Sequence, residues 1–152
     1  MAESTNTNWP ADPYLTSLFV LEIGGIWEAE FSQCTGLQSE TEVVSVEEGG
    51  ENNFAHKLRG RNKNPPLVLK HGISKMSPAL WAWREAMIHR LVPPMLNGAV
   101  ILLDDQKQEV ARWSFRNAAP VKWQGPALKA GDNALAIETL ELSHDGLTVS
   151  AK

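Results

Sequence analysis

The sequence predicts a mainly β protein, a β-sandwich or barrel of about seven or eight strands with one amphipathic helix. Short apolar or alternating runs recur along most of the 152 residues, separated by glycine, proline or acidic turns. One segment, residues 77–91, instead repeats its apolar residues at helical spacing. The length suffices for one domain with a hydrophobic core, and we expect the amphipathic helix to lie against the strands.

The composition is that of an ordinary soluble protein. Hydrophobic residues make up 43% of the chain, and the formal net charge of −4 argues against binding nucleic acid through bulk positive charge. Cys34 is the single cysteine, which excludes an internal disulfide and fits a reducing compartment. No secretory signal is visible, nor any apolar run of the ~20 residues that cross a bilayer. We therefore expect a protein made in the cytosol, without specific nucleic-acid or membrane binding.

The first 14 residues predict a loose polar arm, followed by a single domain over residues 15–152. Trp9 stands out in this arm because its neighbours are polar residues and proline. Its side chain can pack on its own domain or dock on a neighbouring subunit, and the sequence leaves both possibilities open.

The domain is expected to begin with a β-hairpin. Residues 15–23 are rich in Leu, Phe, Val and Ile, which predicts a strand. Gly24 and Gly25 then favour a tight turn, so residues 26–31 should return antiparallel.

A second hairpin is expected over residues 39–60, followed by a basic loop over residues 60–66. Its rising arm and tip are acidic, its returning arm is basic, and few large apolar residues interrupt them. The pattern fits a solvated flap or a projecting arm that pairs acids with the bases of another copy of the chain. The residues expected to make this contact are Glu40, Glu42, Glu47, Glu48, Gly49, Gly50, Lys57 and Arg59.

The helix is predicted to begin at Ser77 and Pro78, a capping residue followed by a proline at the first helical position. The prolines at 93 and 94 should end it, and Leu91 should be its last core residue. Arg84 is expected on the solvent side. The anchors expected to pack on the sheet are Leu80, Trp81, Trp83 and Met87.

The remaining strands follow from shorter patterns. They are expected at residues 67–70, 100–103, 110–117, 121–123 and 135–143. In the last of these, Leu135 and Ile137 lie on one face, whereas Leu140 and Leu142 lie on the other. A bulge at residues 138–139 would realign them. Otherwise both faces are buried, one in the core and one against a partner.

No pattern of catalytic or metal-binding residues emerges. The four histidines lack ligand spacing, and motifs for nucleophiles or nucleotide binding are absent from the sequence. Cys34 has no activating neighbour, so we expect a buried small residue. We expect no enzyme activity and no cofactor; a hydrolase that uses Asp104 or Glu138 is the weaker alternative.

Two segments, WSFRNAAPVKWQGPAL at 113–128 and IETLELSHDGL at 137–147, resemble the tail tube proteins of contractile phages and of contractile injection systems. Shorter pieces agree in the same order: FVLEIGG, FSQCTGL, EEGG, KLRG, the helix with Leu80, Trp81 and Trp83, and LLDD. The resemblance covers residues 15–147. The sequence departs from the family at residues 64–66 and 91–98, which would suit a specialised ring at the base or tip of a tube.

This resemblance implies a structural role. Six copies would join their sheets into a ring around a lumen, and rings would stack into a tube inside a contractile sheath. The implied partners are further copies of the chain, the sheath protein, baseplate and terminator or cap proteins, and cargo in the lumen. An adaptor or initiator ring of the same machine is one alternative, and a monomeric β-sandwich binding module is another. The choice between phage and injection system, the cargo and the target stay open.

Overall fold

The computed structural model describes most of the chain. The described residues are 18–28, 31–50, 53–72, 78–89, 94–131 and 133–151. The expected arm over residues 1–14, with Trp9, lies outside them. So do Ser77 and Leu91, the expected cap and last core residue of the helix.

The described residues form ten strands and one helix, which confirms the expected mainly β fold. The helix, α1, is Pro78–His89. The strands are β1 Phe19–Ile23, β2 Ile26–Glu28, β3 Phe31–Thr35, β4 Glu40–Val46, β5 His56–Lys63, β6 Leu67–Gly72, β7 Leu96–Leu103, β8 Glu109–Gln124, β9 Ile137–Ser143 and β10 Gly146–Ala151.

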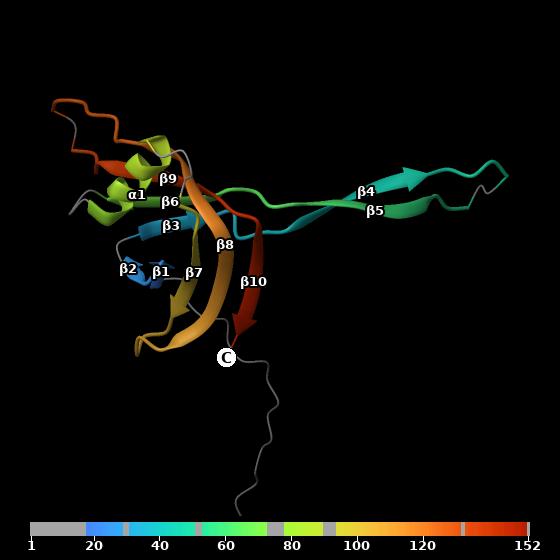
Figure 1. Cartoon of the computed structure of the whole chain (residues 1–152), viewed down its shortest axis with the longest axis horizontal. Coiled ribbons are helices and arrows are strands. Elements are labelled where there is room, and N and C mark those ends of the chain that lie inside the picture. Colours follow the sequence, from blue (N-terminus) through green and yellow to red (C-terminus); the bar gives the residue numbers. More distant parts are fainter. Residues whose placement is uncertain are drawn as a thin grey trace, which may run out of the picture.

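Eight of these strands form one antiparallel sheet, in the order β2-β1-β7-β8-β9-β6-β3, with β10 paired to β8. The first half of β8 lies between β7 and β10, and its second half pairs with β9. The sheet curls along β8 until β1 contacts β3 (Figure 1). The two short strands predicted at 110–117 and 121–123 are therefore parts of one 16-residue strand.

The hydrophobic core lies inside this curl. Alternate residues of each strand point inward, so Leu21, Val100 and Trp113 stand in one row across β1, β7 and β8. Burying a large aliphatic side chain stabilises the fold by about 1.5–3 kcal/mol. Buried core residues come from both halves of the sheet: Leu21, Ile23, Phe31, Leu67, Leu69, Val100, Phe115, Leu140 and Leu142.

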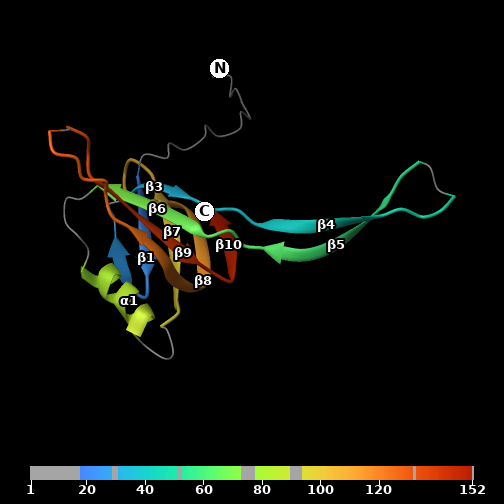
Figure 2. The same cartoon turned by 90° about the horizontal axis from the view of Figure 1, so that it is seen from above.

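Helix α1 covers one side of the sheet and adds Trp83 to the core (Figure 2). Trp83 is 7% exposed, and its indole N–H donates a hydrogen bond to the carbonyl oxygen of Pro94 at 2.8 Å. Leu80 packs against the core, whereas Trp81 and Met87 are half-buried. Arg84, expected on the solvent side, is instead half-buried at the helix–sheet boundary.

Two predicted boundaries near the N-terminal half were wrong. Residues 26–31 do not form one strand: β2 ends at Glu28, and Phe31 begins β3, which pairs with β6 rather than with β1. The basic loop predicted after Gly60 also fails, because β5 continues to Lys63 opposite Glu40. Backbone pairing with β4 extends the strand through charged residues that stay in water.

Of the two alternatives left open for the last strand, the bulge at residues 138–139 does not occur. β9 pairs with β6 in unbroken register from Leu142 to Ile137, and the register shift lies in β8 instead. Glu138 therefore shares the buried face with Leu140 and Leu142. Ile137 is left 44% exposed on the opposite face.

Replacing Trp83 with alanine should lower the free energy of unfolding by about 3–5 kcal/mol, as other truncations of buried aromatic residues do. The change removes core contacts and the hydrogen-bond donor to Pro94. Thermal and urea melts of the purified protein measure the loss. Ile88→Ala is the matched control, because Ile88 lies on the same helix and is 56% exposed. Equal losses from both variants would contradict the orientation of the helix.

Candidate functional site

The hairpin of β4 and β5 is the most prominent surface of the molecule. It forms a two-stranded sheet of its own and projects from the body, on the side away from α1 (Figures 1 and 2). Every residue of both strands is exposed. All eight residues expected to contact another copy lie on this hairpin or at its tip. An isolated two-stranded hairpin is marginally stable in water, so such a structure favours a binding partner.

The base of the hairpin is held firmly by the body. Gly36 has a φ of +90°, and a side chain there would collide with the carbonyl oxygen of Pro66. The amide of Asn64 donates to the backbone carbonyl of Asp145 at 3.0 Å, and His144 Nε2 lies 2.9 Å from the carbonyl oxygen of Pro65. These contacts tie the exit of the hairpin to the turn between β9 and β10, and the chain before its entry passes closely against that exit at Pro66.

Cross-strand pairing leaves most charges of the hairpin without an opposite charge directly across from them; Glu40 and Lys63 at its base are the exception. Lys57 lies opposite Ser45, and Arg59 lies opposite Val43, so neither base faces an acid directly. At the tip, Glu48 lies 3.6 Å from His56, and both side chains remain well exposed. Acidic and basic groups of the hairpin are thus presented to solvent, where another chain can reach them.

Sequence analysis missed an apolar face on this hairpin. Val44 lies directly opposite Leu58, and Val46 lies opposite His56, whose ring packs edge-on against Phe54 at 5.2 Å. Because side chains alternate along a strand, these residues share one face, which we call the apolar face of the hairpin. Its hydrophobic residues are 40–59% exposed. Val44 and Val46, at alternate positions of one strand, could have indicated this face in the sequence, but the surrounding charged residues drew attention to the hairpin's charges instead.

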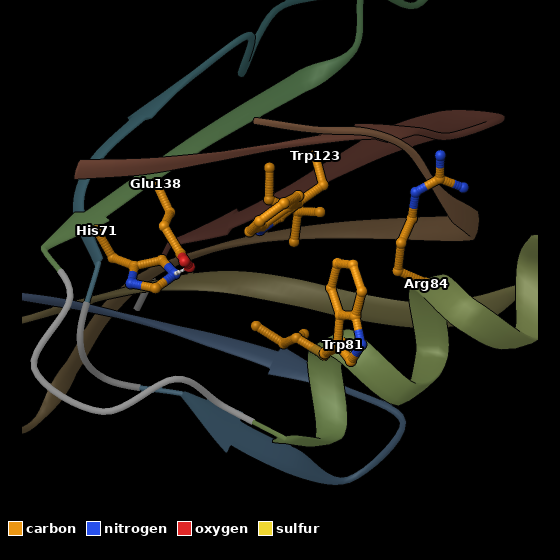
Figure 3. A pocket seen from close by; sticks show the side chains of 7 residues that line it. His71, Trp81, Arg84, Trp123 and Glu138 are labelled. Atoms are coloured by element: carbon orange, nitrogen blue, oxygen red, sulfur yellow. Dashed lines mark ion pairs between the residues drawn. The ribbon is translucent and has the colours of Figure 1, made fainter. Parts of the chain in front are cut away.

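A second candidate site lies between the helix and the sheet (Figure 3). Trp81 from α1 meets Trp123 from β8 edge-on, with ring centroids 4.9 Å apart. His71 and Glu138 point toward one another from the adjacent strands β6 and β9. The space they enclose is about 30 Å³, room for little more than a water molecule. It is too small for a substrate. The Trp81–Trp123 contact packs the helix on the sheet, whereas His71 and Glu138 link two strands of that sheet.

The His71–Glu138 pair was not predicted from the sequence. The two side chains are 13% and 5% exposed, and Nε2 of His71 lies 3.2 Å from Oε2 of Glu138. The ring of His71 also packs edge-on against Phe31 at 5.4 Å. Because the two residues are direct partners in the β6–β9 register, only knowledge of that register could have revealed the pair.

Asp104 and Cys34, the other residues considered for catalysis, have surroundings that fit a structural role. Asp104 caps the turn between β7 and β8, where Oδ1 accepts hydrogen bonds from the backbone N–H groups of Gln106 and Gln108 at 2.8 Å. Cys34 is half-buried against the core, and this burial raises the pKa of its thiol to about 11. The thiol is therefore protonated at neutral pH and a poor nucleophile.

A charged cluster bridges the outer face of the sheet. Arg112 of β8 forms a two-pronged interaction with Glu109 at 3.0 Å and reaches Glu22 of β1 at 2.9 Å. Hydrogen bonds from Glu109 and Glu22 raise the pKa of Arg112 above its usual value. The cluster links β1 to β8 across β7, so it braces the sheet.

Across the described ranges, no group of three or more acidic, histidine or cysteine side chains could hold a metal ion. In the same part of the chain, no helix is long and apolar enough to cross a membrane.

Comparison with known proteins identifies one family. The family model described as T4-like virus tail tube protein gp19 matches residues 15–148. No curated protein matches the chain by sequence.

Solved structures share the fold over nearly the whole chain. A chain of the anti-feeding prophage baseplate has a TM-score of 0.80 and 26% identity, over 93% of this chain and 98% of that one. A chain of the anti-feeding prophage tube-terminating cap has a TM-score of 0.85 and 21% identity, over 100% of both chains. A chain of the sheath–tube complex of the extracellular contractile injection system PVC has a TM-score of 0.82 and 20% identity, over 92% and 93%.

Glu138→Ala should destabilise the protein by about 1–3 kcal/mol, the usual cost of removing one partner of a buried polar pair. Glu141→Ala is the matched control on the same strand. Its carboxylate lies 3.2 Å from the exposed Lys122, and such surface pairs contribute about 0–1 kcal/mol. Urea melts compare the two variants. A larger loss from Glu141→Ala would refute the structural role of the buried pair.

Proposed function

Because the chain belongs to the T4-like virus tail tube protein family, we propose that its copies close into hexameric rings that stack into the hollow inner tube of a contractile machine. The resemblance found in the sequence is confirmed by the family match. The chain is thus a tail tube protein or a related component of contractile injection systems. In the proposed role it acts mechanically: a contracting sheath drives the rigid tube through a target envelope, and the lumen conducts cargo.

The projecting hairpin is the observation that carries the proposal. Its apolar face has no cover from the described residues of its own chain, since Val44, Val46 and Leu58 remain 40–57% exposed. Uncovered apolar surface next to complementary charges favours a protein partner. A second copy of the chain supplies both acids and bases at matching positions, so we assign the hairpin to contacts between stacked rings.

Unpaired sheet edges support ring closure. Within the described residues, β10 pairs only with β8, and β3 pairs only with β6. A bare strand edge exposes backbone donors and acceptors, which neighbouring copies can pair in a closed ring. Closure leaves no edge exposed to further growth in the plane, whereas stacking remains possible along the axis.

A further exposed apolar surface lies around the end of β8 and the start of β9. Val121 and Ile137 are 48% and 44% exposed, and Leu128 and Leu135 in the connecting loop are each 85% exposed. The sequence of residues 135–143 left open that one face of this strand is buried in the core and the other against a partner. The exposed apolar residues beside β9 agree with that possibility. We assign this surface to an assembly contact with a neighbouring subunit or the sheath.

The proposed partners are those of such a machine: further copies of the chain, the sheath protein, the baseplate, and terminator or cap proteins. Structural relatives come from a baseplate, a tube cap and a sheath–tube complex. We propose that the particle is assembled in the bacterial cytoplasm, as part of a phage tail or a particle released from the cell.

Purified protein should form six-membered rings and, at high concentration, tubes. Negative-stain electron microscopy and sedimentation velocity measure this outcome. A specialised adaptor or initiator ring would stop at single rings. A monomeric binding module would sediment as one species near its 16.8 kDa mass, with no rings in the images, and that result would overturn the proposal.

Replacing residues 40–63 with a tight turn should leave the body folded and abolish tubes, because the hairpin adds no buried residue to the core. Glu47→Lys combined with Glu48→Lys should shorten tubes, since the new charges would face Lys57 and Arg59 of the next ring. Single exposed ion pairs contribute about 0–1 kcal/mol, but a six-fold ring repeats them. Tube length by electron microscopy, beside circular dichroism, measures both effects.

A companion variant, Val44→Thr combined with Leu58→Thr, changes the apolar face and leaves all charges in place, so it separates the apolar part of the proposed contact from the charged part. High salt should shorten wild-type tubes if the charged contacts dominate, because the screening length falls to about 3 Å at 1 M. Normal tubes from the shortened hairpin would refute its role in stacking. An unfolded spectrum would show that the hairpin belongs to the folding core.

A further inference from the structure

An apolar groove lies on the inner face of the sheet, where β3 leaves part of β1, β7 and β8 uncovered. Its volume is about 290 Å³, many times the space that one water molecule needs. Ser32 and Gln33 form a polar part of its rim. The apolar lining residues are Phe19, Cys34, Leu37, Val100, Leu102 and Trp113.

The groove continues the core rather than forming a separate surface. Phe19 lies opposite Leu102, and Val100 lies opposite Trp113, so these side chains stand on the same face as the buried core residues. Phe19, Leu102 and Trp113 are nevertheless half-buried. In the same row, Val149 of β10 is 63% exposed. This end of the core is therefore open to solvent unless another segment covers it.

The described chain enters the fold at the rim of this groove. Leu18 precedes Phe19, and its carbonyl oxygen accepts a hydrogen bond from the N–H of Leu103 at 3.0 Å, next to Leu102. Residues 1–17 come before it, and their large apolar side chains are Trp9, Tyr14 and Leu15. Trp9 lies nine positions before Leu18, and an extended chain of that length spans roughly 30 Å.

We propose that the N-terminal arm of the same chain folds back into this groove, with the indole of Trp9 as its anchor. The groove offers aromatic and aliphatic contacts, and the arm supplies an aromatic side chain in an otherwise polar sequence. The short tether to Leu18 holds the arm at an effective concentration in the millimolar range, which favours its own groove over that of another copy. This proposal is independent of ring formation.

Cys34 provides the measurement, because it lines the groove and is the single cysteine of the chain. A docked arm shields its thiol from alkylating reagents. Trp9→Ala should raise the rate of alkylation by N-ethylmaleimide about tenfold, which corresponds to about 1.4 kcal/mol of docking free energy. Asn8→Ala is the matched control in the same arm and should react like the wild type. Mass spectrometry of the full-length protein follows the reaction, and circular dichroism checks the fold.

A disulfide assay identifies which chain supplies the arm. Trp9→Cys places a thiol at the anchor position, and air oxidation should then join it to Cys34 within one chain. Ser4→Cys places a thiol nearer the start of the arm, and this thiol should form a disulfide with Cys34 more slowly than the thiol of Trp9→Cys does. A disulfide within one chain changes the mobility of the monomer band on a non-reducing gel, whereas linked chains run as dimers. Dimers alone, or an unchanged alkylation rate in Trp9→Ala, would overturn the proposal.

Discussion

The body of the subunit depends on one bent strand. β8 is the only described strand that pairs with three others, and it joins the β1–β7–β10 half of the sheet to the β6–β9 half. Its bend has identifiable causes. Asn117 has a φ of +50°, with its side chain held by Asp145 at 2.8 Å, and the register with β9 shifts between Pro120 and Lys122. This bend lets a single sheet curl around its own core.

The same curl leaves the molecule with surfaces that its described residues do not complete. The core is closed by Trp83 on the helix side, whereas the hairpin, two strand edges and the loop after β8 remain exposed. The hairpin projects from the body on the side away from α1 (Figure 1). These surfaces suit the proposed assembly, in which edge contacts close a ring and the hairpin reaches a different neighbour.

The anchoring of the hairpin base suits a mechanical role. Gly36 lets the chain pass against Pro66, and polar contacts from Asn64 and His144 bind the exit of the hairpin to the β9–β10 turn. Residues 64–66 thus form part of this anchor. A load applied to the hairpin would pass directly into the sheet through these contacts. The paired tryptophans join the helix to the sheet, and the His71–Glu138 pair links the adjacent strands β6 and β9.

The sequence by itself determined the elements whose signal is local. Helical spacing identified α1, alternation identified most strands, and the charges marked the hairpin, because periodicity depends only on which face of an element meets water. The tertiary structure decided what depends on partners distant in sequence. It paired Phe31 with β6 instead of β1, buried Glu138 opposite His71, and continued β5 to Lys63. These choices follow from strand register, and register is set by the whole sheet rather than by any one segment.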